Sequence, residues 1–136
     1  MVQNLYFTSR VSSRMNLTFE EASIQALLAA RERLDTLDFG VIGFNEACEV
    51  VVYNTYEASS AALRQARVLG KNLFLEIAPC LNNSMVAHRF DSESELYTII
   101  SYVLALRMRP VPVRLRLLKD SSASTRFLLV DRANLK

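Results

Sequence analysis

The sequence predicts an α+β fold, in which a five-stranded antiparallel sheet carries short helices on one side and an N-terminal capping helix. Three observations lead to this prediction. An amphipathic helical stretch comes first, β-rich stretches follow as a pair and then as a group of three, and an irregular helical stretch separates the two groups. Short turns within each group make neighbouring strands antiparallel. Strands grouped in this way, with helices kept apart from them, are typical of α+β domains.

The composition is that of one globular domain. The chain has 136 residues, of which 51% are hydrophobic and 22% charged, with a formal net charge of +2. Disordered chains combine low hydrophobicity with high net charge, which is not the pattern here. No apolar run approaches the roughly 20 residues of a membrane-spanning helix, and two cysteines cannot make a disulfide framework. We expect a reduced, cytoplasmic protein with a flexible arm at residues 1–16 and a single domain at residues 17–136.

The first regular element is predicted as one amphipathic helix from about residue 19 to 34. Thr18 and Glu21 form a capping-box pattern, in which each side chain can bond to the other residue's backbone amide. Acidic residues begin the stretch, and Arg31 and Arg33 end it, as the helix dipole favours. The apolar positions recur at near-helical spacing: Ile24, Leu27, Leu28 and Leu34.

Two short strands are predicted next, at residues 39–44 and 50–53, joined by a turn at residues 45–49. Residues 54–69 have a short and irregular pattern that predicts one or two short helices. Gly70 tolerates positive φ and is typical of a helix end.

The second half of the chain is predicted to contain one more short helix and then three strands. An apolar stretch runs from Leu73 to Cys80, and residues 84–92 are compatible with a helix. The turns between the strands are marked by Pro110 and Pro112 and by a serine-rich run. The predicted strands are residues 95–109, 111–118 and 126–131.

The segment from Val68 to Cys80, VLGKNLFLEIAPC, resembles the chromophore-attachment segment of the photoactive yellow protein family. In that family, too, a Gly-Lys-Asn turn leads through an apolar stretch into Ala-Pro-Cys. Residues 34–40 resemble the family's start of the first strand, and Tyr53 with Glu57 resembles its chromophore-anchoring segment, all in register with Cys80. The resemblance extends to about residue 132 and implies a PAS fold.

The resemblance implies a blue-light photoreceptor with p-coumaric acid (4-hydroxycinnamic acid) attached as a thioester to Cys80. Tyr53 and Glu57 would donate hydrogen bonds to its phenolate oxygen, and Asn54 would bond to nearby backbone. Signalling would proceed by chromophore isomerisation, proton transfer from Glu57 and loosening of the N-terminal segment. The residues implied to line the apolar pocket or its rim are Ile42, Leu73, Ile77, Leu104, Leu106 and Met108.

The implied chemistry is physically consistent. A phenol ordinarily ionises near pH 10, like tyrosine, and burial opposes ionisation further. A phenolate in an apolar cavity therefore needs hydrogen-bond donors aimed at its oxygen. Tyr53 offers a hydroxyl, whereas Glu57 can donate only when it is protonated, a state that burial favours.

This sequence also departs from the family pattern near the implied pocket. Ala61 and Leu63 stand where the family has a threonine that bonds the tyrosine and an arginine that covers the pocket. Leu104 and Leu106 stand where aromatic residues are usual. These differences predict a less restrained Tyr53 and an apolar pocket mouth.

Two other functions stay open. One is a PAS-fold interaction or small-ligand module without a covalent pigment. The other is an enzyme in which Cys80 accepts an acyl group, with His88 eight residues further on as a possible base. We expect an unknown downstream signalling protein as partner, no nucleic acid, no membrane, and a monomer or weak homodimer. The arginines that alternate along two predicted strands are interpreted as a solvated sheet face: Arg107, Arg109, Arg114 and Arg116.

Overall fold

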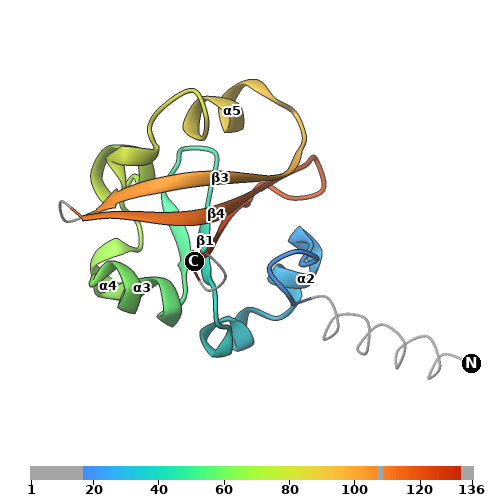
Figure 1. Ribbon diagram of the computed structural model, residues 1–136. Helices are drawn as coiled ribbons and strands as arrows, with labels where there is room; N and C mark the ends of the chain where they lie inside the picture. Colours follow the sequence, from blue (N-terminus) through green and yellow to red (C-terminus); the bar gives the residue numbers. More distant parts are fainter. Residues whose placement is uncertain (1–16, 107–108, 133–136) are drawn as a thin grey trace, which may run out of the picture.

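The computed structural model describes residues 17–106 and 109–132. The predicted five-stranded antiparallel sheet is confirmed, with strand order β2-β1-β5-β4-β3 (Figure 1). The predicted arm at residues 1–16 lies outside the described residues. The strands are β1 (Gly40–Phe44), β2 (Val50–Tyr53), β3 (Leu96–Leu106), β4 (Arg109–Lys119) and β5 (Arg126–Asp131).

Short helices occupy the connection between β2 and β3, as predicted. In Figure 1, helix α2 lies on the opposite side of β1 from α3 and α4. No helix in the described part of the chain is long and apolar enough to cross a membrane. The helical elements are α2 (Ile24–Ala29), η1 (Arg31–Thr36), α3 (Thr55–Ala61), α4 (Gln65–Val68), η2 (Leu73–Ile77), η3 (Pro79–Leu81) and α5 (Ala87–Ser92).

The sheet separates two hydrophobic cores. Successive side chains of a strand point to opposite faces. On β5, Leu128 and Val130 therefore join one core, whereas Phe127 and Leu129 join the other. We call the first face the helix side, because residues of α4, η2, η3 and α5 cover it, and the second the cap side, because residues 17–34 cover it.

The single helix predicted over residues 19–34 is wrong. Residues 18–21 form a turn, in which the Thr18 hydroxyl accepts from the Glu21 amide at 3.2 Å, as the capping-box pattern predicts. Helix α2 begins only after Ser23, whose side chain caps it, and a separate 3-10 segment, η1, follows.

The cap helix is interrupted because the sheet binds its backbone. The guanidinium group of Arg116 donates to the carbonyl groups of Phe19, at 3.2 Å, and Ala22. An unbroken helix would use these same carbonyl groups for its own backbone hydrogen bonds. The interpretation of this strand face as solvated is also wrong at Arg114 and Arg116, which lie half-buried beside the N-terminal segment. Arg109 is exposed, and Arg107 lies outside the described residues.

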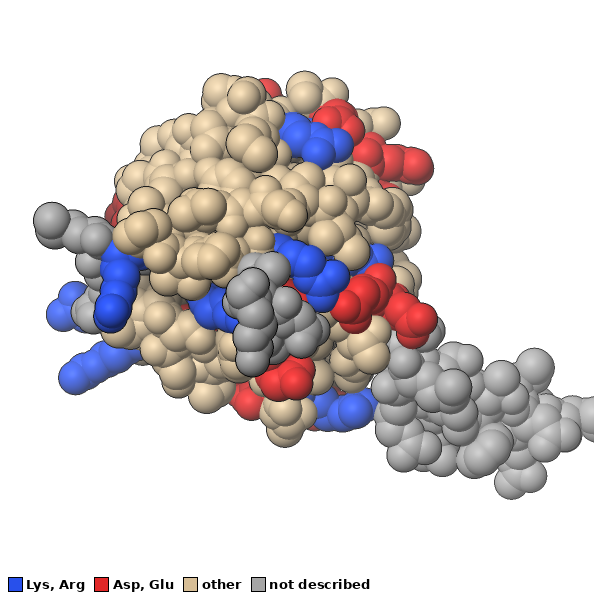
Figure 2. Space-filling view, viewed as in Figure 1, with Lys and Arg blue, Asp and Glu red and all other residues tan. Residues whose placement is uncertain are grey.

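Charged side chains of both signs are distributed over the surface. On the face shown in Figure 2, basic side chains stand alone at the left edge, and elsewhere basic and acidic side chains lie together around a broad uncharged area. On the face of β3 that points away from the helix side, three large side chains are exposed: Tyr97, Ile99 and Val103.

Candidate functional site: an apolar cavity with one carboxylate

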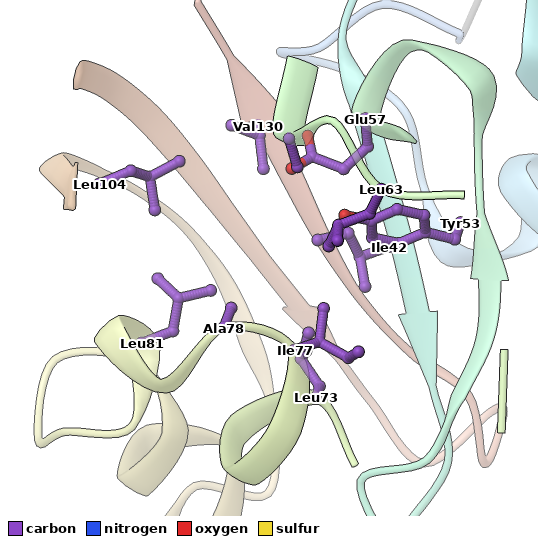
Figure 3. Close-up of a pocket in the computed structure, with 11 residues that line it drawn as sticks. Ile42, Tyr53, Glu57, Leu63, Leu73, Ile77, Ala78, Leu81, Leu104 and Val130 are labelled. Atoms are coloured by element: carbon purple, nitrogen blue, oxygen red, sulfur yellow. The ribbon is translucent and has the colours of Figure 1, made fainter. Parts of the chain in front are cut away.

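A cavity of about 200 Å³ lies within the helix side of the fold. Figure 3 shows Tyr53 and Glu57 approaching it from one side, with Ala78 and Leu81 across from them. Among the lining residues that the structure describes, only these two carry polar side-chain groups. The lining residues are Ile42, Tyr53, Glu57, Ala61, Leu63, Leu73, Ile77, Ala78, Leu81, Leu104 and Val130.

Asn54 places the two polar side chains. It is 2% exposed and follows Tyr53, the last residue of β2. Its side-chain oxygen accepts from the amides of Val41, at 2.9 Å, and Glu57, at 3.1 Å, so that it joins β1 to the first turn of α3. Its side-chain amide donates to the carbonyl groups of Leu34 and Phe39. Asn54 therefore bonds to nearby backbone, and its N-cap position directs Glu57 toward the sheet.

Glu57 forms a buried ion pair with Arg132. The two guanidinium nitrogens of Arg132 donate to Oε1 at 2.8 Å and to Oε2 at 3.1 Å. The side chains are 4% exposed for Glu57 and 15% for Arg132. Burial raises the pKa of the Glu57 carboxyl, and the hydrogen bonds and charge of Arg132 act in the opposite direction. The balance between these two effects decides whether Glu57 can donate a proton.

Tyr53 is the other polar group of the cavity wall, and its ring is nearly buried. Burial and the nearby Glu57 raise the pKa of its hydroxyl, so this group stays a neutral hydrogen-bond donor. Its carbonyl group accepts from the Gln65 side chain at 2.7 Å, which fixes the end of β2 against α4.

Gly40 makes room for the carboxylate. A Cβ atom added at this position would overlap Oε1 of Glu57 and would lie 3.2 Å from Cβ of Val130. The backbone of β1 therefore packs directly against the carboxylate, and any side chain at this position would displace it.

Cys80 lies in η3, half-buried, with its neighbours Pro79 and Leu81 in the same turn. Its carbonyl group accepts from the Tyr102 hydroxyl at 2.6 Å and from the Asn83 side chain at 3.2 Å. Ala78 and Leu81 line the cavity on either side of it in the sequence, but the Cys80 side chain is not part of the described wall.

The structure brings most of the predicted pocket residues together. Ile42, Leu73, Ile77 and Leu104 line the cavity, as do Tyr53 and Glu57. The side chains of Leu106 and Met108 lie outside the described residues. Ala61 and Leu63, which differ from the family pattern, are also in the wall.

Sequence reasoning did not find two residues of the site. Arg132 follows the last strand, and nothing in its sequence neighbourhood indicates a buried ion pair with a residue 75 positions earlier. The sequence places Gly40 at the start of the first predicted strand and indicates no role for it in the site. Gly40 begins β1 and lies 17 positions before Glu57 in the sequence, so only the packed structure shows that a side chain here would meet the carboxylate.

The sheet order, the helical crossover and the cavity between the sheet and the helices define a domain of the PAS class. No family model matches the chain. It is 27% identical over 103 residues to photoactive yellow protein from Rhodothalassium salexigens, which covers 74% of this chain and 82% of that protein. It is also 27% identical over 120 residues to photoactive yellow protein from Cereibacter sphaeroides, covering 85% of this chain and 97% of that protein.

Solved structures agree with this assignment. The photoactive yellow protein domain of the sensor histidine kinase Ppr from Rhodospirillum centenum superposes with a TM-score of 0.67 at 26% identity, covering 73% of this chain and 90% of that one. A PAS domain of an HTR-like protein from Haloarcula marismortui shares the fold alone, with a TM-score of 0.59 at 13% identity over 79% of this chain and 96% of that one. Over about three quarters of its length or more, the chain is therefore similar to photoactive yellow proteins, at 26–27% identity, and it shares their PAS fold.

Proposed function

We propose that this protein is a light receptor that carries p-coumaric acid as a thioester on Cys80, with the phenolic oxygen at Tyr53 and Glu57. The cavity of about 200 Å³ carries the proposal. An engineered apolar cavity of about 150 Å³ accepts benzene, so this one has room for an aromatic ring and part of a short chain. Its two polar groups lie together on one side, where a single phenolic oxygen could reach both.

Attachment is a simple acyl transfer. The Cys80 thiolate attacks the carbonyl carbon of an activated 4-hydroxycinnamoyl ester or thioester. A C–S bond forms, the bond to the leaving group breaks, and the leaving group takes up the proton that the thiol released. The half-buried position of Cys80, between Ala78 and Leu81 of the cavity wall in the sequence, supports this role.

Signalling would follow from moving the phenolic oxygen. Isomerisation of the double bond would withdraw this oxygen from Tyr53 and Glu57. The proton affinities of the phenol and of Glu57 would then change, and a proton would move between the protein and the chromophore. An uncompensated buried charge typically costs about 3–5 kcal/mol, which a local opening of the fold would relieve. This sequence of events is reversible and involves no turnover.

Intact-mass measurement after loading tests the proposal. The native protein and the Cys48→Ala variant should each gain one acyl group from an activated ester of p-coumaric acid, and the Cys80→Ala variant none. Cys48 is a matched control, because it is also half-buried and burial raises the pKa of its thiol. An adduct on Cys48, or no adduct on folded native protein, would contradict the proposal.

A second candidate function is a small-ligand module without a covalent pigment. It is favoured by one observation, namely that Tyr53 and Glu57 line the cavity and the Cys80 side chain does not. An acyl-transfer enzyme has less support. His88 is exposed on α5, and no hydrogen bond joins it to Cys80 among the residues that the structure describes.

The downstream partner is proposed to be a signalling protein. The neighbour from Rhodospirillum centenum is a domain of a sensor histidine kinase, which supports a partner of this kind. Co-purification from the source cell, in the dark and in light, would identify it. The same preparation would show whether the protein is a monomer or a weak homodimer.

A further inference from the structure

The positive charge next to the cavity belongs to Arg132, which directly follows β5. Arg132 contacts both oxygens of Glu57, at 2.8 and 3.1 Å, in a bidentate pair. Its guanidinium carbon also lies 6.0 Å from the centre of the Tyr56 ring. Leu63, where the family pattern has an arginine, contributes no charge to the wall. The positive charge of this site therefore comes from a different element, and it is bound directly to the carboxylate.

The groups around Glu57 limit what its carboxylate can do. Tyr53 faces it from β2, Tyr56 lies one residue earlier on α3, and Arg132 faces it from the end of β5. The backbone of β1 at Gly40 closes another side. Among these described groups, Arg132 alone carries a positive charge.

A carboxylate in a bidentate ion pair can still accept a hydrogen bond from a ligand, so the ligand atom beside it must be a donor. Each carboxylate oxygen has two lone pairs, so an oxygen that accepts from Arg132 can accept one further hydrogen bond from the cavity. A hydroxyl group can donate that bond and leave the ion pair intact. A phenolate oxygen can only accept, and it would face a carboxylate of the same charge, which is strongly unfavourable in a buried site.

We propose that Arg132 is a specificity-determining residue: by holding Glu57 as a carboxylate, it makes the cavity select a neutral phenol that donates a hydrogen bond over the corresponding phenolate. This inference rests on the proposed function only in taking the ligand to be a phenol. It deepens that function by placing the shared proton on the phenolic oxygen at rest. The absorption of a bound cinnamoyl group would then lie toward the near ultraviolet.

Removing the charge of Arg132 reverses the preference. Without its cation, the buried Glu57 carboxyl takes up a proton, since burial disfavours the charged form. A protonated Glu57 donates a hydrogen bond, and together with Tyr53 it offers two donors to a phenolate oxygen. Arg132→Gln should thus favour the anionic form of the same ligand.

Reversible binding of 4-nitrophenol tests the inference. The neutral and anionic forms of this small phenol have separate absorption bands, and it titrates near neutral pH. It should be titrated in the Cys80→Ala background, so that failure of acylation at Cys80 does not affect the result. The variants are Arg132→Gln and Arg132→Lys, and Arg114→Gln is the matched control, because Arg114 pairs with Asp131 and Glu20 on the cap side.

The parent protein should bind the neutral form more tightly than the anion by about tenfold or more, which raises the apparent pKa of the bound dye by about one unit. Arg114→Gln should leave this preference unchanged, Arg132→Lys should reduce it, and Arg132→Gln should abolish or reverse it. The inference is overturned if the parent prefers the anion, if Arg132→Gln retains the preference, or if the folded parent does not bind the dye.

Discussion

Asp131 and Arg132 are neighbours at the end of β5, yet they form ion pairs on opposite faces of the sheet. Asp131 accepts from Arg114 of β4, which also binds Glu20 of the N-terminal segment. Arg132 binds Glu57 of α3 at the cavity. The first group connects the cap to the sheet. Its Glu20 and Arg114 side chains are partly exposed, at 53% and 25%, whereas Asp131 is buried. The second is almost buried, so its charge balance has far larger consequences.

This comparison indicates how a change in the cavity could reach the cap. The two pairs are one residue apart on the same strand end, and a movement of Arg132 acts directly on the backbone of Asp131. If the two faces are independent, substitutions on one should leave the other unchanged; if they act as one unit, both should respond.

The largest expected difference between the two ion-pair groups is in how much each contributes to the free energy of unfolding. Arg132→Met should lower the free energy of unfolding by about 3 kcal/mol near neutral pH, because it leaves Glu57 buried without its cation. Arg114→Met should cost less, about 1 kcal/mol, because Arg114 and Glu20 are partly exposed to water, although Asp131 is buried. Urea unfolding of both variants makes the comparison. Equal losses would show that the buried pair has no special role.

The loss in Arg132→Met should also diminish as the pH falls, because Glu57 can then become neutral at lower cost. A loss that does not change with pH would point to packing of the arginine stem instead of charge.

The next largest difference is expected between alanine substitutions at the two glycines of β1, because Gly40 faces the cavity and Gly43 faces the cap. A Cβ at Gly40 would overlap Glu57 Oε1, whereas a Cβ at Gly43 would lie 2.9 Å from Val52 and 3.0 Å from Phe127 on the cap side. Both alanine variants should lose about 1–3 kcal/mol through overpacking. Only Gly40→Ala should also weaken binding of a phenol, measured by dye titration. Equal binding by both variants would mean that the Glu57 position does not matter for the ligand.

Hydrogen exchange should show whether the faces communicate. On loaded protein, illumination should speed amide exchange around Glu57 and in residues 17–34. The cap is expected to respond because Arg116 and Arg114 hold it through a few contacts, which break more easily than the sheet. The Arg114→Gln variant should show fast exchange in the cap already in the dark. Unchanged cap protection, despite a bleached band, would place the output on another surface.

The smallest expected effects are in the pH dependence of stability, and they have opposite signs. The pKa of Glu57 is raised above 4.5 by burial, so its favourable contribution is complete below pH 4.5 and is lost as the pH rises through the folded value. The pKa of Glu20 is lowered by its hydrogen bond from Arg114, so its contribution is present above pH 4.5 and is lost as the pH falls.

In the native protein, Glu57 makes stability decline as the pH rises, and Glu57→Gln should remove this decline. Glu20 makes stability decline as the pH falls, and Glu20→Gln should remove that decline. The second effect should be small and should weaken in salt, because Glu20 is exposed. Thermal unfolding across this pH range checks both signs. The same sign for both variants would contradict the assignment of the two faces.

The fold could be predicted because its signals are local. The turn at residues 45–49 and the alternation along β4 are properties of neighbouring residues, and the observed strands agree with them. The turn predicted at Pro110 and Pro112 is wrong, because both prolines lie inside β4 and pair with β3. The cap helix could not be predicted in full, because Arg116, 94 positions after Ala22, takes the carbonyl groups that would continue it. Local propensity is a weak guide wherever a distant side chain competes for the backbone.

The residues of the candidate site also fall into those that the sequence could predict and those that depend on long-range contacts. Tyr53, Asn54 and Glu57 could be named because their spacing to Cys80 resembles a known family, and the structure adds that Asn54 is the N-cap of α3. Arg132 is held by a contact across 75 residues, and its pairing depends on which face the end of β5 presents. A register shift of one residue would have placed Asp131 at the cavity instead.

The central claim is that the cavity holds a light-responsive phenolic chromophore on Cys80, and illumination of loaded protein tests it most directly. The absorption band of the bound chromophore should decrease in light and return in the dark, with a matching change in the infrared carboxyl region that is absent in Glu57→Gln. A singly loaded, folded protein whose band does not respond to light at any absorbed wavelength would contradict the claim.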